Sequence, residues 1–259
     1  MIHIWTLLRY IFSIRIFNTI IFNMKAFPFR YALKFPVIIK QKVDIISVGR
    51  IVLGDRPKRG MMTVGGGNIK GNGKVRFLNK GTIILNTGKV QICQGCIIEN
   101  YGVIEFKGSS FVSENSKLLI REKLEMGSYT RIGFNSCIMD SNDHFLVDMI
   151  NHSVKSMTSP IVIGNWNWMG CHTFVKKGTI TPDFIIVAAP YAVLYKDYSY
   201  LTKGSVIGGT PAKLIRETNQ RIIFNPNNED IIRKWFFAHR EATDVSVDDF
   251  TDDLEQFCS

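Results

Sequence analysis

The sequence lacks a run of about 18 apolar residues, the length that a membrane-spanning helix requires. Arg9 and Arg15 interrupt its most apolar stretch, residues 1–24. It also lacks the basic start and the small-residue cleavage site of a secretory signal peptide. The five cysteines are scattered and odd in number, unlike a secreted disulfide framework. These absences argue against a spanning leader and a disulfide scaffold, and they predict a cytoplasmic protein.

Acidic residues are also scarce. The 259 residues include 32 Lys and Arg against 22 Asp and Glu, which gives a formal net charge of +10. Residues 1–50 hold eight basic residues and one acid, whereas residues 241–259 hold seven acids and no Lys or Arg. Such a charge favours anionic partners, namely phosphates, anionic lipids or nucleic acid. Because the sequence contains no DNA- or RNA-recognition motif, we expect no nucleic-acid partner.

The apolar leader, residues 1–24, leaves two interpretations open. If it is helical, Arg9 and Arg15 lie about 120° apart around the axis, so the helix has no clean polar face. Such a segment can make a peripheral contact with the inner face of the cell membrane. It can equally pack against its own body or against a neighbouring subunit.

Apolar residues recur with a period of six. From Ile163 to Val193 every sixth residue is apolar, with Thr181 as the single exception. A helix would place apolar residues three and four apart, and a half-buried strand would alternate them. A period of six instead fits a parallel β-helix, in which each hexad forms one short strand and a turn. The predicted fold class is therefore all-β.

The same rhythm occurs upstream and is interrupted once. Four further apolar residues are six apart: Ile120, Met126, Ile132 and Ile138. Between Ile138 and Ile161 the pattern fails, and residues 139–160 form a largely polar insertion with two histidines. Because a rigid solenoid can position a loop that carries chemistry, we expect function at this insertion.

Three regions follow from these patterns. Residues 1–60 form an apolar, basic leader and an irregular connection, and residues 61–216 form the β-helix with its insertion. Glycine-rich turns, including residues 65–74, predict less regular first coils. Residues 217–259 contain an acidic tail that we expect to fray and a C-terminal α-helix at about residues 228–240, which Asn225-Pro226 introduces.

Three segments carry a resemblance to a known family. They are Ile163-Gly-Asn-Trp-Asn-Trp-Met-Gly170, Val175-Lys-Lys-Gly178 and Val206-Ile-Gly-Gly-Thr-Pro-Ala-Lys-Leu-Ile-Arg216. Through them the chain resembles the hexapeptide-repeat O-acetyltransferases, especially those that modify sugars for surface polysaccharides. The resemblance implies a left-handed parallel β-helix that works as a homotrimer. It also implies acetyl-CoA as the acyl donor and a sugar hydroxyl of a capsule, O-antigen or exopolysaccharide as the acceptor.

The resemblance also implies a coenzyme groove. Small residues would let an extended pantetheine arm lie against the backbone, and basic residues would meet the nucleotide phosphates. The small residues are Gly170, Cys171, Ala188 and Ala189, and the basic residues are Lys213 and Arg216. The alternative is that the small residues only turn corners of the coil. Thr181 and Thr210 depart from the family's pattern.

His144 is the predicted catalytic base. Acyl transfer from a thioester to a hydroxyl needs a base, because an alcohol attacks poorly until its proton is removed. Asp140-Ser-Asn-Asp-His144 resembles the family's D-x-D-x-H stretch, with Asn142 in place of the second acid. Asp140 or Asp143 would orient the imidazole and stabilise its charged form. The alternative is a surface histidine in a polar loop.

Three further residues are candidates for contact with the acceptor or the acyl group. Trp166 and Tyr129 would stack on a sugar. His172 would polarise the acyl carbonyl, or it would pack against Trp168, which is the interpretation that we favour. A backbone N–H near Gly170 is the expected donor to the oxyanion.

Metal chemistry is not expected. Cys93-Gln-Gly-Cys96 is a single C-x-x-C without a second pair at zinc spacing. His144, His152 and His172 do not have the spacing of the β-helix carbonic anhydrases. Cys171 as an acyl-enzyme nucleophile has no evident base beyond its neighbour His172.

Two other functions stay open. One is an N-acetyltransferase acting on an amino sugar. The other is a non-catalytic β-helix scaffold, which would consume no thioester. The length of the acyl group and the identity of the acceptor stay open as well.

Overall fold

The computed structural model describes residues 14–40, 43–67 and 73–259. The chain forms two compact units, Met1–Thr218 and Asn219–Ser259. Residues 1–13 of the predicted leader and residues 68–72 of the glycine-rich segment lie outside the described residues. Within the described part of the chain, no helix is long and apolar enough to cross a membrane.

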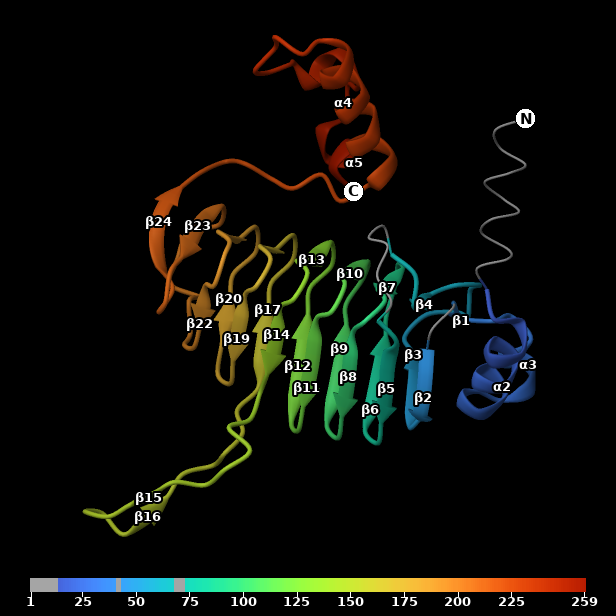
Figure 1. The fold of residues 1–259 in the computed structure, drawn as a ribbon, viewed down its shortest axis with the longest axis vertical. Helices are drawn as coiled ribbons and strands as arrows, with labels where there is room; N and C mark the ends of the chain where they lie inside the picture. The colour runs from blue at the N-terminus through green and yellow to red at the C-terminus, as the bar shows by residue number, and fades with distance from the viewer. Residues whose placement is uncertain (1–13, 41–42, 68–72) are drawn as a thin grey trace. The chain divides into compact units, whose positions relative to one another are not determined.

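The first unit consists mainly of three sheets whose strands stack in register (Figure 1). The nine-stranded sheet runs in the order β1 (Val37–Ile39), β4 (Met62–Val64), β7 (Val90–Ile92), β10 (Ser110–Val112), β13 (Thr130–Ile132), β18 (Trp168–Met169), β21 (Ile186–Val187), β23 (Ser205–Gly208) and β24 (Lys213–Glu217). The seven-stranded sheet contains β2 (Val43–Ser47), β5 (Val75–Asn79), β8 (Ile97–Asn100), β11 (Lys117–Ile120), β14 (Cys137–Met139), β19 (Phe174–Lys176) and β22 (Val193–Leu194). The six-stranded sheet contains β20 (Ile180–Thr181), β17 (Ile161–Ile163), β12 (Lys123–Met126), β9 (Val103–Phe106), β6 (Thr82–Leu85) and β3 (Arg50–Leu53).

Successive strands pass from the nine-stranded sheet to the seven-stranded sheet, then to the six-stranded sheet and back. Each circuit is one coil, and all its pairings are parallel until β24 turns back antiparallel on β23. The predicted parallel β-helix is confirmed. We call the corners of the β-helix edges and name them by the sheets that they join. The first edge joins the nine- and seven-stranded sheets, for example at residues 170–173, and the second edge joins the seven- and six-stranded sheets, for example at residues 177–179. The third edge joins the six- and nine-stranded sheets, for example at residues 164–167.

The inward-pointing residues explain the rhythm of the sequence. All four upstream residues of the six-residue pattern are buried, from Ile120 to Ile138. The coil is nevertheless longer there than three hexads. Ile98 pairs with Leu118 and Leu118 with Ile138, which is 20 residues per coil, whereas Trp168 pairs with Ile186, 18 residues on. The strict hexads therefore describe only the last coils.

Thr181, the single break in the hexads, occupies an inward position and is buried. Its Oγ1 accepts a hydrogen bond from the Gly164 N–H at 3.2 Å. The hydroxyl is thus satisfied inside the coil, which explains how the pattern tolerates a polar residue.

Helices close the first end of the coil. Helix α2 (Ile16–Ala26) packs beside β1, and the four-residue α3 (Phe29–Ala32) follows. The Asn23 amide donates to the Val37 carbonyl at 2.6 Å and accepts from its N–H at 3.1 Å. Thr19 Oγ1 accepts from the Ile39 N–H at 3.0 Å. These side chains satisfy the backbone groups of the edge strand, which an open β-helix would leave unpaired.

The second unit is helical. It contains α4 (Pro226–Ala238), the 3₁₀-helix η1 (Val247–Asp249) and α5 (Leu254–Cys258). The Asn225 side chain caps α4 by accepting from the Asn227 N–H at 3.0 Å, so the helix begins two residues before the predicted start. The acidic tail does not simply fray, because Asp253 caps α5 and Phe257 of that helix is buried.

Candidate functional site

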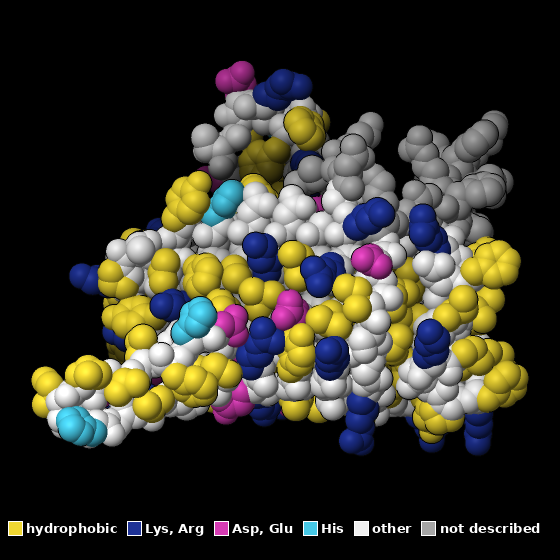
Figure 2. All heavy atoms as spheres, turned by 60° about the horizontal axis from the view of Figure 1, so that its bottom comes forward, with side chains coloured by type: hydrophobic (Ala, Val, Ile, Leu, Met, Phe, Trp, Pro, Cys, Tyr) yellow, Lys and Arg dark blue, Asp and Glu magenta, His cyan; other side chains and the backbone are white. Residues whose placement is uncertain are grey.

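The polar insertion leaves the coil at the second edge as a narrow arm, which projects away from the sheets (Figure 1). Strands β15 (Val147–Asp148) and β16 (Ser153–Val154) pair antiparallel within it. At its base, Ser141 pairs with Thr158, and the Asn142 N–H donates to the Met157 carbonyl at 2.9 Å. The arm carries many exposed apolar side chains (Figure 2). It is therefore held firmly at its base and exposes an apolar tip.

His144 lies at the base of this arm and is exposed. It lines a hollow of about 310 Å³. The other lining residues are Asn142, Leu146, Val147, Asp148, Ser153, Lys155, Ser156 and Lys177. A base needs access to the proton that it removes, and this position provides it. The His144 imidazole is therefore accessible to a molecule that enters the hollow.

The charge in this hollow is positive. Lys155 and Lys177 both line it, and Lys177 Nζ donates to the Ser156 carbonyl at 2.8 Å. The single acid, Asp148, accepts hydrogen bonds from the N–H groups of Ile150 and Asn151 and from the Asn151 amide. Those donors hold the pKa of Asp148 below its usual value, so it stays ionised within its own turn. Sequence patterns did not reveal the two lysines, because they join the hollow only through the fold.

Asp140 holds a corner of the coil. Its side chain is fully buried, and its carboxylate accepts three backbone N–H groups: from Arg121 at 2.8 Å, Glu122 at 2.8 Å and Lys123 at 2.9 Å. Burial raises the pKa of Asp140, and the three amide donors oppose that rise. Its hydrogen-bonding capacity is directed at the preceding coil.

Asp143 anchors the start of the arm. Its Oδ1 lies 3.2 Å from Arg121 Nε and accepts from the Ser141 hydroxyl at 3.2 Å. Arg121 also pairs with Glu99 and lies over the Tyr101 ring. Among the described residues, neither Asp140 nor Asp143 hydrogen-bonds to His144. Both candidate carboxylates, Asp140 and Asp143, thus make their hydrogen bonds with other residues and not with the imidazole.

The small residues of the predicted coenzyme groove meet at the first edge. Gly170 lies directly against the next coil, since a Cβ there would be 2.6 Å from the Cβ of Ala189. Ala188 lies under Gly208 in the coil that follows. Close packing of successive coils therefore requires small residues here, whether or not a coenzyme binds. Lys213 and Arg216 are exposed on β24, in the same terminal coils.

A second hollow, of about 420 Å³, adjoins this edge. It is lined by Asn135, Cys137, His172, Thr173, Phe174, Tyr191, Val193 and Thr210. The His172 ring contacts the rings of Tyr191 at 5.1 Å and Phe134 at 5.4 Å rather than that of Trp168. Its Nε2 lies 3.5 Å from Asn135 Nδ2. The packing partner expected for His172 was therefore wrong, although packing itself is observed.

Trp166 and Tyr129 lie at the third edge. Their rings stack 4.3 Å apart at 26°, and Phe184 continues the column 6.3 Å from Trp166. All three residues have positive φ, from 57° to 62°. The column thus lines up the turns of three successive coils, which is a structural role for rings that the sequence suggested for sugar stacking.

The candidate residues consequently occupy all three edges of the β-helix, over several successive coils. The small residues lie at the first edge, His144 at the second, and the aromatic column at the third. The first and second edges are separated by the length of a strand of the seven-stranded sheet, which is about 10 Å for a three-residue strand such as β14. One chain alone does not gather these groups around a single point.

Among residues 14–40, 43–67 and 73–259 no group of three or more His, Cys, Asp or Glu is placed to hold an ion. Cys93 and Cys96 are fully buried. Burial raises the pKa of Cys96 to about 12, and burial also raises the pKa of Cys93. Both side chains are therefore neutral thiols packed at a turn.

The chain is similar in fold to solved structures of acyltransferases. One is a variant of AntD, an N-acyltransferase from Bacillus cereus, in complex with dTDP and coenzyme A: it is 15% identical, covers 78% of this chain and 89% of its own, and has a TM-score of 0.45. The polysialic acid O-acetyltransferase OatWY is 18% identical over 74% of this chain and 94% of its own, with a TM-score of 0.39. A hexapeptide-repeat-containing acetyltransferase from Vibrio cholerae O1 biovar eltor, complexed with acetyl coenzyme A, is 12% identical over 78% and 85%, with a TM-score of 0.34. No family model and no curated protein matches this chain.

Proposed function

We propose that this protein is an acetyl-CoA-dependent O-acetyltransferase that modifies a sugar hydroxyl in polysaccharide biosynthesis. The observation that carries the proposal is the position of His144. An exposed imidazole lines a hollow of about 310 Å³ at the base of an arm fixed to a rigid coil. Such a scaffold can hold a base and an acceptor in reacting geometry.

In the proposed reaction, His144 takes the proton of the acceptor hydroxyl as its oxygen attacks the thioester carbonyl of acetyl-CoA. A tetrahedral oxyanion forms, and one backbone N–H of the first edge, near Gly170 or Cys171, donates to it. The C–S bond then breaks, the acetyl group stays on the sugar oxygen, and the leaving thiolate takes the proton back from His144.

We propose further that the site forms between copies of the chain in a homotrimer. His144 lies at the second edge and the small residues lie at the first edge. These edges are at opposite ends of the strands of the seven-stranded sheet. A neighbouring copy that brings its first edge to this second edge would complete the site. The exposed apolar side chains of the arm, such as Met149 and Ile150, suit burial against such a neighbour.

Thiol release from acetyl-CoA tests the proposed activity. The acceptor panel contains neutral oligosaccharides, acidic glycans, nucleotide sugars and amino sugars. We expect thiol release that depends on a hydroxyl-bearing glycan, with the acetyl group found on oxygen by NMR. Acetylation of an amino sugar nitrogen would identify the N-acetyltransferase alternative, and no release with any acceptor would support the scaffold alternative.

The two lysines of the hollow, Lys155 and Lys177, predict an acceptor that carries negative charge, since they outnumber its single acid, Asp148, which is engaged within its own turn. Replacement of both by glutamine is expected to raise KM for an acidic glycan about tenfold, because their attraction for a carboxylate or phosphate is lost. The matched control is Lys176→Gln, an exposed neighbour on β19 outside the hollow. Equal effects on acidic and neutral acceptors would contradict this assignment.

Lys213 and Arg216 predict how the donor is held. If they contact the nucleotide phosphates, Lys213→Gln with Arg216→Gln raises KM for acetyl-CoA about tenfold. The same variant should leave the rate with acetyl-pantetheine, which lacks those phosphates, unchanged. Lys203→Gln, which removes an exposed charge paired with Asp183, is the control. An equal loss of rate with acetyl-CoA and with acetyl-pantetheine would show that the two residues do not contact the phosphates.

A further inference from the structure

Helix α2 has apolar residues on both of its sides, and the coil covers only one of them. The inner side binds β1 and buries Phe22. On the outer side, Phe17 is 81% exposed, and Ile16 and Ile21 are more than half exposed. A helix that only covered a sheet edge would carry polar residues on its outer side. The apolar outer side therefore needs another explanation.

The exposed apolar surface continues beyond α2. It includes Phe29 of α3 and Leu33, both more than half exposed. We call the set Ile16, Phe17, Ile21, Met24, Phe29 and Leu33 the N-terminal apolar face. Figure 2 shows apolar side chains gathered at this end of the coil, on the right, with Lys and Arg among them. Contiguous exposed apolar patches of this kind mark contact with a partner or a membrane.

The charge around the face favours a membrane over a protein partner. Residues 14–40 contain five basic residues and no Asp or Glu. Four of them, Arg15, Lys25, Arg30 and Lys34, are exposed. Apolar side chains beside exposed basic residues are the composition that binds the boundary between lipid headgroups and acyl chains in an anionic bilayer.

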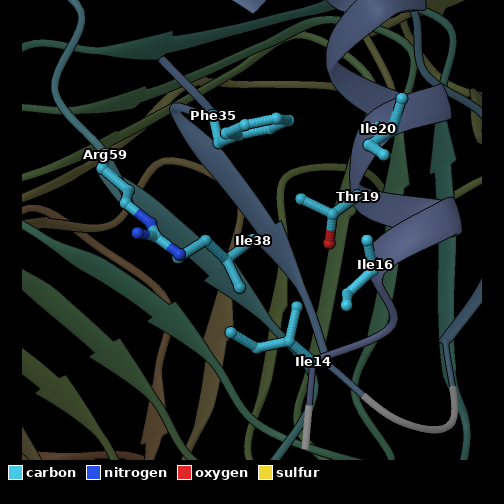
Figure 3. A pocket seen from close by; sticks show the side chains of 7 residues that line it. All are labelled: Ile14, Ile16, Thr19, Ile20, Phe35, Ile38 and Arg59. Atoms are coloured by element: carbon cyan, nitrogen blue, oxygen red, sulfur yellow. The ribbon is translucent and has the colours of Figure 1, made fainter. Parts of the chain in front are cut away.

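A hollow beside α2 fits the same occupant. It measures about 100 Å³ and lies between α2 and the strand β1. Figure 3 shows its apolar lining, including Ile16, Ile20 and Ile38, with Arg59 on the side opposite the helix. The apolar lining suits methylene groups, and a guanidinium binds phosphate oxygens in a bidentate manner. The hollow thus matches the end of an acyl chain next to a lipid phosphate.

We propose that the N-terminal apolar face docks on an anionic membrane surface. Its aromatic and aliphatic side chains enter the headgroup boundary, while the basic residues around it contact lipid phosphates. The β-helix would then contact the membrane through the end that α2 closes. This docking does not depend on the acyltransferase activity.

Sedimentation with vesicles of phosphatidylcholine alone, or of phosphatidylcholine with phosphatidylglycerol, tests the proposal on the full-length protein. We expect binding to the anionic vesicles that weakens with salt. Phe17→Ser, Ile21→Ser and Phe29→Ser together should weaken it at least about tenfold. Arg15→Gln, Lys25→Gln, Arg30→Gln and Lys34→Gln together should do the same for anionic vesicles.

The matched control removes exposed apolar residues elsewhere. Ile231→Ser, Phe237→Ser and Leu254→Ser, three exposed residues of the second unit, should leave vesicle binding unchanged. Since all substituted side chains are exposed, thermal unfolding should stay close to that of the unaltered protein. Binding without preference for anionic vesicles, or full binding by the Phe17 variant, would overturn the proposal. A smaller assembly for the Phe17 variant than for the unaltered protein would also overturn it, because the face would then hold a second copy.

Discussion

Replacement of His144 by asparagine is expected to lower kcat by about 10²- to 10⁴-fold, the range that a general base contributes. The sugar hydroxyl would then attack the thioester with its proton still in place. Because His144 is exposed and makes no side-chain hydrogen bond within the described residues, the substitution should leave folding intact. The measurement is thiol release under saturating acetyl-CoA and acceptor, with thermal unfolding recorded on the same sample.

A second histidine provides the matched control. His152 lies on the same arm, is also exposed, and does not line the hollow. His152→Asn should therefore retain nearly full activity. If His144→Asn keeps the unaltered rate, or if both variants lose activity equally, the imidazole of His144 is not the base.

Replacement of Asp140 by alanine is expected to lower the free energy of unfolding by about 3 kcal/mol or more. The substitution leaves three N–H groups, those of residues 121–123, without their acceptor in a part-buried corner of the coil. Each buried donor without a partner costs about 1 to 3 kcal/mol, and some relaxation of the corner lowers the sum. Urea unfolding followed by circular dichroism measures the loss.

Two variants check the cause. Asp140→Asn keeps one acceptor oxygen and should lose less than Asp140→Ala. Asp143→Ala removes a half-exposed ion pair with Arg121 and a hydrogen bond from the Ser141 hydroxyl, and it should cost less than about 1 kcal/mol. A stable Asp140→Ala protein with lost activity would instead assign Asp140 to the orientation of His144, as the motif first suggested.

Much of the fold was predictable because coil geometry repeats within the sequence. Inward positions are filled mainly by apolar side chains. The apolar residues at every sixth position from Ile163 onward therefore reveal the coil in the sequence. The insertion before Ile161 was visible for the same reason, as the place where the repeat fails. The 20-residue coils upstream were not visible, since extra residues at the edges leave many inward residues still six apart.

The candidate site was less predictable, because it depends on which residues face each other across coils. Asp140 and His144 are neighbours in sequence, yet the Asp140 carboxylate binds a corner about twenty residues upstream. Trp166 and His144 both belong to segments that resemble one family, but they lie at different edges. Lys177 lines the hollow beside His144 only because the arm returns over the second edge. No local pattern encodes such neighbours.

The most direct test of the central claim follows the acetyl group itself. Acetyl-CoA labelled in the acetyl group is mixed with the protein in a single turnover, with and without the acceptor that the thiol-release panel identifies. We predict that the label appears on a hydroxyl oxygen of the acceptor, that none stays on the protein, and that His144→Asn transfers at least about 100-fold more slowly. Label retained on Cys171 or another side chain, or transfer at an unchanged rate by His144→Asn, would contradict direct transfer assisted by His144.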